Sequence, residues 1–320
     1  MLLGRRLMGA VMLLGFLTPP SVSAVHDQPP TARFKSSVSV VSVSAIVRDR
    51  KGRFVRDLAS RDFVVAEAGQ TKAILDFREL QDGPVKIGVL VDASGSMRVG
   101  RKAVDAQQAA RHLFAALRGK DEAALFSFDT QLDRVKDFTT DVTSLDAAFE
   151  RLNTPFGQTS LYDAVQQAAD LVTAHGRKGG KLLQRAALVV ITDGIDTKSR
   201  LTAQQVAAAA SAIDVPVYVI SVMAPIDDPS VDDTPPMDVT GLTQLAQNTG
   251  GELFTASAPA HASVAARRIV DELRHQYVLA FEASNTAGWR SLEVRARDPK
   301  LIVRARTGYS AGASGRPTEH

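Results

Sequence analysis

Cysteine is absent from this chain of 320 residues. Its absence excludes disulfides, thiolate metal sites, thiol nucleophiles and a lipid-modified cysteine anchor. The chain also has little excess of charge of either sign, because its 38 Lys and Arg residues and 35 Asp and Glu residues give a net charge of only +3. No basic stripe with interleaved aromatic residues is present, so we do not expect a nucleic acid partner. The P-loop and the G-x-G-x-x-G string are missing too, which leaves a nucleotide-dependent enzyme unsupported.

Long apolar runs are missing as well. The apolar run near the start of the chain, Leu7 to Leu17, is shorter than the roughly 20 residues that span a bilayer. It follows Arg5-Arg6 and precedes Val22-Ser23-Ala24, an order that is typical of a secretory signal peptide. We therefore predict a signal peptide over residues 1–24, and a mature protein that is exported to the periplasm or secreted, without a membrane span. An uncleaved anchor or a buried helix is the alternative.

The apolar residues that are present, 45% of the chain, are enough for a sizeable core. Residues 25–33 are polar and contain proline, so we expect a linker. Residues 34–82 alternate apolar and polar positions, as half-buried strands do. They predict the N-terminal part of a small all-β domain, and residues 276–309 predict its C-terminal part. Residues 310–320 are rich in Gly, Ser and Ala and predict a flexible tail.

Residues 83–275 follow a different pattern, in which strand-like and helix-like segments alternate. Val85 to Val91 is an almost unbroken apolar run, typical of a parallel strand that is covered on both faces. Further strands are expected over 123–128, 132–138, 186–192, 217–222 and 252–254, and helices over 101–117, 145–152, 161–175, 203–213, 239–248 and 262–275. The alternation predicts an α/β fold with a doubly wound, mostly parallel sheet. Only a tight turn precedes Leu132, so 132–138 is expected to be one antiparallel edge strand. This domain would be inserted in the small all-β domain.

Carboxylate and hydroxyl side chains gather at three predicted loops of this sheet. Asp92, Ser94 and Ser96 follow its first strand, Thr159 precedes a helix, and Asp193 follows a later strand. Ligands of open α/β sheets bind outside the carboxyl ends of the strands. All five side chains offer hard oxygen donors, which favour Mg²⁺, Ca²⁺ or Mn²⁺ over zinc or copper. The sequence therefore predicts a divalent metal site at this edge.

Such a site would be incomplete without a further ligand. Two carboxylates and neutral hydroxyls leave a divalent ion short of ligands, so it would keep water or take a carboxylate from a partner. Helix capping is the alternative interpretation, because Ser, Thr and Asp are favoured at helix N-termini. Capping would explain Ser96, but it does not explain why Asp92, Thr159 and Asp193 fall at matching strand ends.

The pattern Asp92-x-Ser94-x-Ser96, then Thr159, then Asp193 resembles the metal-ion-dependent adhesion site (MIDAS) of the von Willebrand factor type A family. The resemblance covers residues 83–275. It implies an α/β fold with a parallel sheet, a bound Mg²⁺ or Ca²⁺ ion, and binding to proteins. It also implies that the two Ser and the Thr coordinate the ion directly, with the two Asp at the ion or behind these ligands.

A second resemblance covers the flanking segments. The string Val47-x-Asp49-x-x-Gly52 and the later Glu67-x-Gly69 are similar to the N-terminal segment of exported bacterial proteins of the "VWFA-related" group. Glu272-Leu273-Arg274 and the strand around Trp289-Arg290 are similar to the C-terminal segment of that group. This group is largely uncharacterised, so the resemblance implies architecture and export more than function.

The expected function is binding of a protein ligand through a divalent ion, with an exposed Asp or Glu of the ligand completing the metal site. We do not expect an enzyme, because no general base stands out beside the candidate metal ligands. One alternative is a structural or assembly scaffold of the cell envelope without a functional metal. A metal-dependent hydrolase is the other alternative.

Overall fold

The computed structural model describes residues 40–81, 83–152, 156–177, 185–212, 215–222, 238–284 and 286–311. The predicted signal peptide and linker lie outside these residues. All of the described residues fall within one compact unit. Among their helices, none is both long and apolar enough to cross a membrane.

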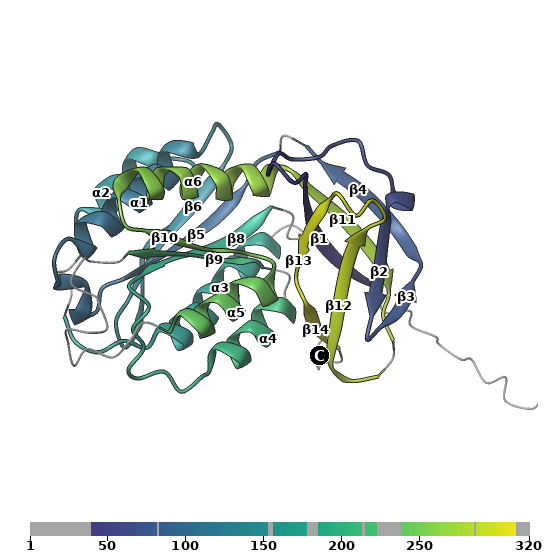
Figure 1. Cartoon of the computed structure of the whole chain (residues 1–320). Coiled ribbons are helices and arrows are strands. Elements are labelled where there is room, and N and C mark those ends of the chain that lie inside the picture. Colours follow the sequence, from purple (N-terminus) through teal and green to yellow (C-terminus); the bar gives the residue numbers. More distant parts are fainter. Residues whose placement is uncertain are drawn as a thin grey trace, which may run out of the picture. The chain divides into compact units, whose positions relative to one another are not determined.

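A six-stranded sheet forms the centre of the α/β domain (Figure 1), with strand order β10-β9-β8-β5-β6-β7. Its strands are β5 (Lys86–Asp92), β6 (Glu122–Phe128), β7 (Leu132–Thr139), β8 (Ala186–Thr192), β9 (Val217–Val222) and β10 (Leu253–Ala256). Neighbouring strands are parallel, except that β7 pairs antiparallel with β6 at the edge. The predicted doubly wound sheet with one antiparallel edge strand is confirmed.

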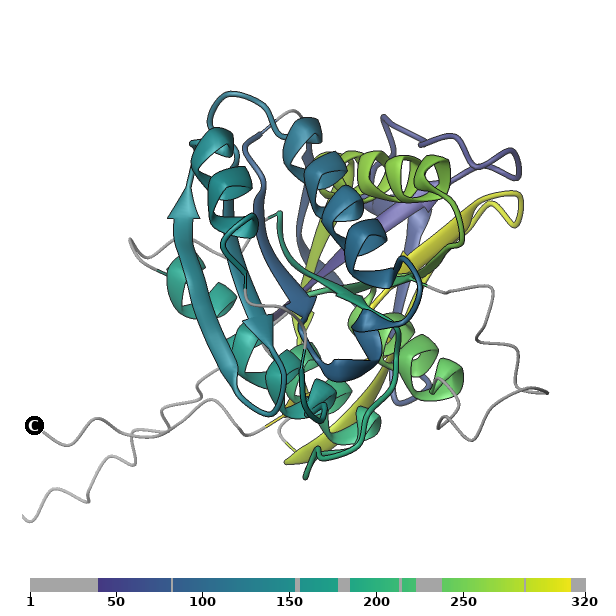
Figure 2. The same ribbon diagram turned by 90° about the vertical axis from the view of Figure 1, so that its left-hand side faces the viewer.

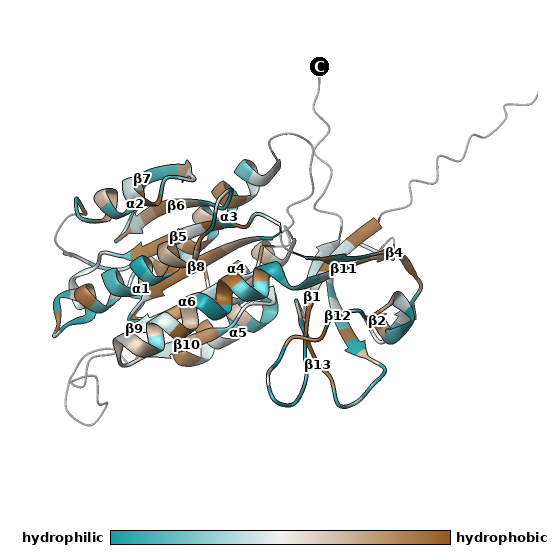
Figure 3. Ribbon diagram, turned by 90° about the horizontal axis from the view of Figure 1, so that it is seen from above, coloured by the Kyte–Doolittle hydropathy of each residue, from teal (hydrophilic) through white to brown (hydrophobic). Residues whose placement is uncertain are grey.

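Helices cover both faces of this sheet, as Figures 1 and 2 show. The helices are α1 (Lys102–Ala116), α2 (Val142–Phe149), α3 (Leu161–Arg177), α4 (Ala203–Ala212), α5 (Val239–Thr249) and α6 (Pro259–Arg274). Side chains of α1, α2 and α6 share one apolar cluster with the sheet, and those of α3, α4 and α5 share another. In β5, Val89 and Val91 join the first cluster and Leu90 joins the second. Burial on both faces explains why the central strands β5, β8 and β9 are almost uniformly apolar. Figure 3 shows β5 and β8 in brown, whereas the edge strand β7 carries polar residues.

Two antiparallel sheets form the smaller β domain, with orders β13-β1-β11-β4 and β14-β12-β2-β3. The strands are β1 (Val40–Arg48), β2 (Phe63–Glu67), β3 (Gln70–Lys72), β4 (Ile74–Leu80), β11 (Gln276–Glu282), β12 (Gly288–Ala296), β13 (Ile302–Ala305) and β14 (Gly308–Ala311). N-terminal strands pair with C-terminal ones, β1 with β11 and β2 with β12. Both sheets contribute side chains to one core. The α/β segment is therefore inserted in an all-β domain, as the sequence predicts.

The last strand differs from the expectation. Strand β14 extends to Ala311, two residues into the segment predicted to be a tail. It pairs with the start of β12, where Trp289 lies opposite Ser310, and the buried Tyr309 joins the core of the β domain. This pairing orders a short segment that is rich in small residues.

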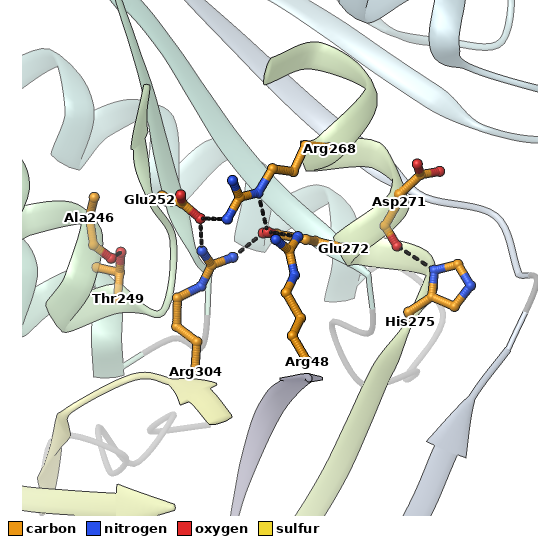
Figure 4. A network of polar contacts seen from close by, with 9 residues as sticks. All are labelled: Arg48, Ala246, Thr249, Glu252, Arg268, Asp271, Glu272, His275 and Arg304. Carbon is orange, nitrogen blue, oxygen red and sulfur yellow. Dashed lines mark hydrogen bonds and ion pairs between the residues drawn. The ribbon is translucent and has the colours of Figure 1, made fainter. Parts of the chain in front are cut away.

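A cluster of ion pairs joins helix α6 to two strands of the β domain (Figure 4). Glu272 of α6 is fully buried and pairs with Arg48 of β1, at 2.5 Å, and with Arg304 of β13. Glu252, which precedes β10, also forms ion pairs with Arg304 and with Arg268 of α6. These contacts hold the last helix of the inserted domain against the strands that surround the insertion.

Candidate metal-binding site

The first loop of the candidate site begins at Asp92, the last residue of β5. This carboxylate is 2% exposed, and its Oδ1 accepts a hydrogen bond of 2.9 Å from the backbone N–H of Ser94. Its Oδ2 accepts a hydrogen bond of 2.6 Å from the Thr192 hydroxyl, at the end of the neighbouring strand β8. Both carboxylate oxygens are therefore held by groups from two adjacent strand ends.

The two serine hydroxyls of this loop lie side by side. Ser94 Oγ and Ser96 Oγ are 3.1 Å apart. Ser94 precedes a short 3₁₀ helix, Gly95–Arg98, but its side chain makes no capping hydrogen bond among the described residues. Helix α1 has Arg101 at its N-cap, again without a side-chain cap. Capping therefore does not explain why hydroxyls occupy positions 94 and 96.

The second loop is bonded directly to the first through the backbone. The N–H of Gly95 donates to Gly157 O at 2.9 Å, and the N–H of Phe156 donates to Ala93 O at 3.0 Å. Gly157 has φ of +87°, a left-handed conformation that glycine adopts without the steric cost of a Cβ atom. These bonds fix the distance between the serine loop and the loop that carries Thr159.

Thr159 is buried and is held by its backbone. Its N–H donates to Thr197 Oγ1 at 2.9 Å, and its carbonyl accepts hydrogen bonds from the N–H groups of Thr197 and Lys198, at 3.0 and 2.8 Å. Among the described residues, Thr159 forms hydrogen bonds through its N–H and carbonyl groups. Its backbone is thus fixed in place, and none of these bonds uses its hydroxyl.

Asp193 directly follows β8, the strand that lies beside β5 in the sheet. From β5 the chain continues to β6 on one side of it, and β8 later pairs with β5 on the other side. Asp92 and Asp193 therefore lie at the point where the strand order reverses. Ligands of open α/β sheets usually bind at this point. Asp193 Oδ1 accepts a hydrogen bond of 3.2 Å from the N–H of Ile195. Its Oδ2 lies 3.1 Å from Nζ of Lys102, a buried residue at the start of α1.

Burial makes the charged form of Asp92 less favourable than it would be in water. Loss of solvation, together with the nearby Asp193 carboxylate, raises the pKa of Asp92 to about 7, although hydrogen bonds from Ser94 and Thr192 act in the opposite direction. A buried carboxylate with a raised pKa gains stability when a cation approaches it. The site therefore has the electrostatic property that a metal-binding site needs.

The donor set fits a hard divalent cation. Among the described residues, no group of three or more His, Cys, Asp or Glu side chains could hold a metal. An ion at this edge would thus depend on the hydroxyls of Ser94, Ser96 and Thr159 in addition to the two carboxylates. Oxygen donors of this kind suit Mg²⁺, Ca²⁺ or Mn²⁺.

Hydrogen bonds link Asp92, Ser94 and Ser96 to one another, and backbone bonds at Gly157 and Phe156 connect their loop to the loop that carries Thr159. Asp193 follows the neighbouring strand β8 at the same edge of the sheet. Sequence reasoning missed two polar partners, Thr192 and Lys102. Thr192 is the polar last residue of the otherwise apolar strand β8, directly before Asp193. Lys102 falls in one helical stripe with Ala106, Ala109 and Leu113, all of them buried, so its spacing placed a charged residue on the apolar face.

Comparison with known proteins agrees with this architecture. Residues 87–195 match the model of the von Willebrand factor type A domain. The matched segment begins in β5 and ends just after Asp193, so it includes the five candidate residues. The match, together with the fold, supports a von Willebrand factor type A (VWA) domain within the chain. No curated protein matches the chain.

Several solved structures resemble parts of the chain. BatB from Bacteroides thetaiotaomicron is 19% identical with a TM-score of 0.48, over 59% of this chain and 98% of that one. Proximal thread matrix protein 1 of the mussel byssus, with a zinc-occupied MIDAS motif, is 15% identical with a TM-score of 0.49, over 62% of this chain and 50% of that one. A von Willebrand factor type A protein from Catenulispora acidiphila is 12% identical with a TM-score of 0.48, over 87% and 74%.

Proposed function

We propose that the chain is an exported protein whose VWA domain binds a protein ligand through a divalent metal ion. The observation that carries the proposal is the pair of buried carboxylates, Asp92 and Asp193, at adjacent strand ends beside the paired hydroxyls of Ser94 and Ser96. Ser94, Ser96 and Thr159 would coordinate the ion, and the two Asp would bind it directly or through water. Export rests on the N-terminal sequence pattern.

An acidic side chain of the partner would complete the metal site. The chain supplies two carboxylates and three neutral hydroxyls, and hard divalent ions take six or more oxygen ligands in most protein sites. The remaining position suits a carboxylate, which combines an oxygen donor with the charge that a divalent ion attracts. We propose Mg²⁺ as the resident ion, with Ca²⁺ and Mn²⁺ as the alternatives.

Binding is favoured over catalysis because two histidines that could act as general bases are engaged elsewhere. His175 Nε2 lies 2.5 Å from a Glu122 carboxylate oxygen. Glu122 starts β6, whereas Asp92 pairs with Phe128 at the opposite end of that strand. His261 contacts Ser257, four residues away along the chain. A metal-activated water would thus lack a base from either histidine.

The first test is the melting temperature of residues 25–320 in EDTA, Mg²⁺, Ca²⁺ and Mn²⁺. An ion that binds only the folded state adds stability, about 2.7 kcal/mol at a hundredfold excess over its Kd. We expect the wild type to melt at a higher temperature with metal, and Asp92→Ala and Thr159→Ala to show no metal effect. Thr143→Ala, an exposed position on α2, is the matched control and should respond as the wild type does. Equal melting temperatures in EDTA and in every ion would favour the scaffold instead.

Metal affinity is expected to depend on pH. The pKa of Asp92 is raised to about 7 by burial and by Asp193, so below that pH an incoming ion must displace a proton. The apparent Kd for Mg²⁺ should then increase about tenfold for each pH unit below 7 and level off above it. Calorimetric titrations between about pH 5 and pH 8 would measure this slope. An affinity that does not change over this range would show that Asp92 is already ionised without metal.

The partner itself can be sought with the same variants. Binding to an envelope extract should require Mg²⁺, should be lost in Asp92→Ala, and should be weakened by free glutamate but not by glutamine. Retention of the same proteins in EDTA would contradict a metal-dependent mode of binding. Detectable hydrolytic turnover that is lost in Asp92→Ala would instead favour the enzyme.

A further inference from the structure

We propose that the partner's acidic residue is flanked by apolar side chains, which pack on three exposed apolar residues beside the candidate metal site. These residues, Val99, Phe156 and Val239, form an apolar rim. This inference rests on the proposed function and deepens it, because it names the kind of protein segment that the site accepts. The contrasting partner is a segment that is acidic throughout.

Large apolar side chains are exposed at nine positions of the described residues. Phe156 is the most exposed of them, at 75%, and Val99 and Val239 are 41% and 50% exposed. Single apolar residues on a surface need no explanation, whereas a group of them around a polar site indicates an interaction surface. The rim residues form such a group because each of them adjoins a loop that carries candidate metal ligands.

Two rim residues are tied to the serine loop by backbone hydrogen bonds. The N–H of Phe156 donates to the carbonyl of Ala93, directly before Ser94, at 3.0 Å, and the N–H of Val99 donates to Ser96 O at 3.2 Å. Among the described residues, the apolar clusters of the fold include neither Phe156 nor Val99. Their side chains therefore contribute to the surface beside the paired hydroxyls rather than to a core.

The third rim residue, Val239, lies beside the loop that begins with Asp193. It is the first residue of α5, and the preceding N-cap residue, Asp238, donates its backbone N–H to Gly194 O at 3.1 Å. Asp238 Oδ2 also accepts a hydrogen bond of 2.5 Å from the Tyr162 hydroxyl of α3. These bonds fix the start of α5, so a partner meets backbone that is already in place.

The rim determines how strongly a bound carboxylate is held. Water competes with a ligand carboxylate for the ion and weakens their attraction, which becomes stronger where water is excluded. Interfaces achieve this by surrounding a central polar contact with side chains that keep water out. Apolar residues on both sides of the partner's acid would cover the rim and add the free energy of their own burial. A segment that is acidic throughout would instead bring charged groups against apolar side chains.

Exposed cations in the same loops act differently. Arg98 and Lys198 are exposed and attract any acidic segment through water, whatever residues flank its acid. Salt screens such attraction between exposed charges. Discrimination between acidic peptides by their apolar neighbours therefore measures the rim and not these cations.

The experiment uses short, terminally blocked and fluorescently labelled peptides, with fluorescence anisotropy in Mg²⁺ or EDTA and about 0.15 M salt. Their central residues are Leu-Glu-Leu, Ser-Glu-Ser, Glu-Glu-Glu or Leu-Gln-Leu. Phe156→Ser removes the largest rim side chain, and Phe156→Leu keeps an apolar one. Val264→Ser is the matched control, because Val264 is 59% exposed on α6.

We expect the wild type in Mg²⁺ to bind Leu-Glu-Leu about tenfold more tightly than Ser-Glu-Ser and Glu-Glu-Glu. Binding should be lost in EDTA and with Leu-Gln-Leu, which lacks the carboxylate. Phe156→Ser should lose most of the preference, whereas Phe156→Leu and Val264→Ser should keep it. The effect of Mg²⁺ on the melting temperature should be unchanged in every variant, because none of them alters a candidate metal ligand.

The inference is overturned if Leu-Glu-Leu and Ser-Glu-Ser bind equally, if Glu-Glu-Glu binds most tightly, or if Phe156→Ser keeps the wild-type preference. A wild type that responds to metal but binds none of the peptides would overturn the inference as well. A wild type that shows neither a metal response nor metal-dependent peptide binding would contradict the proposed function itself, so the two failures are distinguishable.

Discussion

Replacing Glu272 with Gln is expected to lower the free energy of unfolding by about 3–5 kcal/mol, the usual cost of breaking a buried ion pair from one side. The Glu272 side chain is fully buried on α6, between Arg48 of β1 and Arg304 of β13. Arg268, one turn earlier on α6, also approaches it, at 3.4 Å. Glutamine would turn an amide N–H group toward these cations and remove their shared counter-charge.

The loss is expected to be large because the remaining carboxylate cannot replace Glu272. Glu252 already pairs with Arg268 and Arg304 (Figure 4), so three arginines would be left around one carboxylate. Arg48, with its side chain 15% exposed, would lose the partner that faces it. A buried cation without a partner is more costly than the net contribution of the pair it came from.

Denaturant titration measures this effect, with Glu282→Gln as the matched control. Glu282 lies on β11 and is exposed, so its replacement should change stability by less than about 0.5 kcal/mol. We expect the midpoint to shift for Glu272→Gln and not for the control. Equal midpoints for both variants would show that the cluster contributes no net stability.

Acid is expected to destabilise the protein partly through Glu67 of β2. This carboxylate is 1% exposed and contacts Lys72 Nζ at 2.8 Å, the Ser284 N–H and hydroxyl, and the Tyr309 hydroxyl. Burial alone would raise its pKa, but the contacts with Lys72, Ser284 and Tyr309 outweigh it and lower the pKa to about 2. Its charged form is therefore stabilised in the folded protein.

The direction of the pH effect follows from this lowered pKa. The unfolded chain binds the Glu67 proton near the ordinary pKa of 4.5, whereas the folded chain binds it only near 2. The stability from Glu67 is thus complete above pH 4.5 and is lost as the pH falls from 4.5 through about 2. A difference of this size corresponds to about 3 kcal/mol.

Unfolding titrations at pH 5 and at about pH 2 would measure it. The wild type should lose about 3 kcal/mol more than Glu67→Gln between these two conditions, because the variant has no proton to bind. Glu293→Gln on the neighbouring strand β12, at a residue whose side chain is 62% exposed, should follow the wild type. Parallel curves for the wild type and Glu67→Gln would mean that the contacts of Glu67 do not favour its charged form.

Much of the α/β domain could be predicted from local patterns. Strand β5 is apolar along almost its whole length because both of its faces are covered, and the tight turn before Leu132 limits β7 to an antiparallel pairing. The candidate residues Asp92 and Asp193 could be placed together because the carboxyl ends of parallel strands share one edge. The metal that would bind there remains a prediction.

Other features depend on contacts that no local pattern records. Strand β14 is a strand only because it pairs with β12, and its composition of small residues resembles a tail. Lys102 is charged and lies at a helix start, where lysine is usually exposed, and its contact with Asp193, which follows β8, joins residues that are far apart in the sequence. The arrangement of the β strands in two sheets also follows from pairings between the two ends of the chain.

The pairing of the first strand with late ones has a consequence for the order of synthesis. Val40 of β1 lies opposite Glu282, and Ile46 lies opposite Arg304. Residues 86–274 contain all the strands of the six-stranded sheet and the helices that cover it. The α/β domain is therefore complete before β11 is synthesised. Strand β1 emerges from the ribosome first and obtains its neighbours last. Val47 and Arg48 have local partners in Val55 and Phe54. The rest of the strand lacks its neighbours throughout that interval, so its edges are open to pairing with other chains, as unpaired strands are.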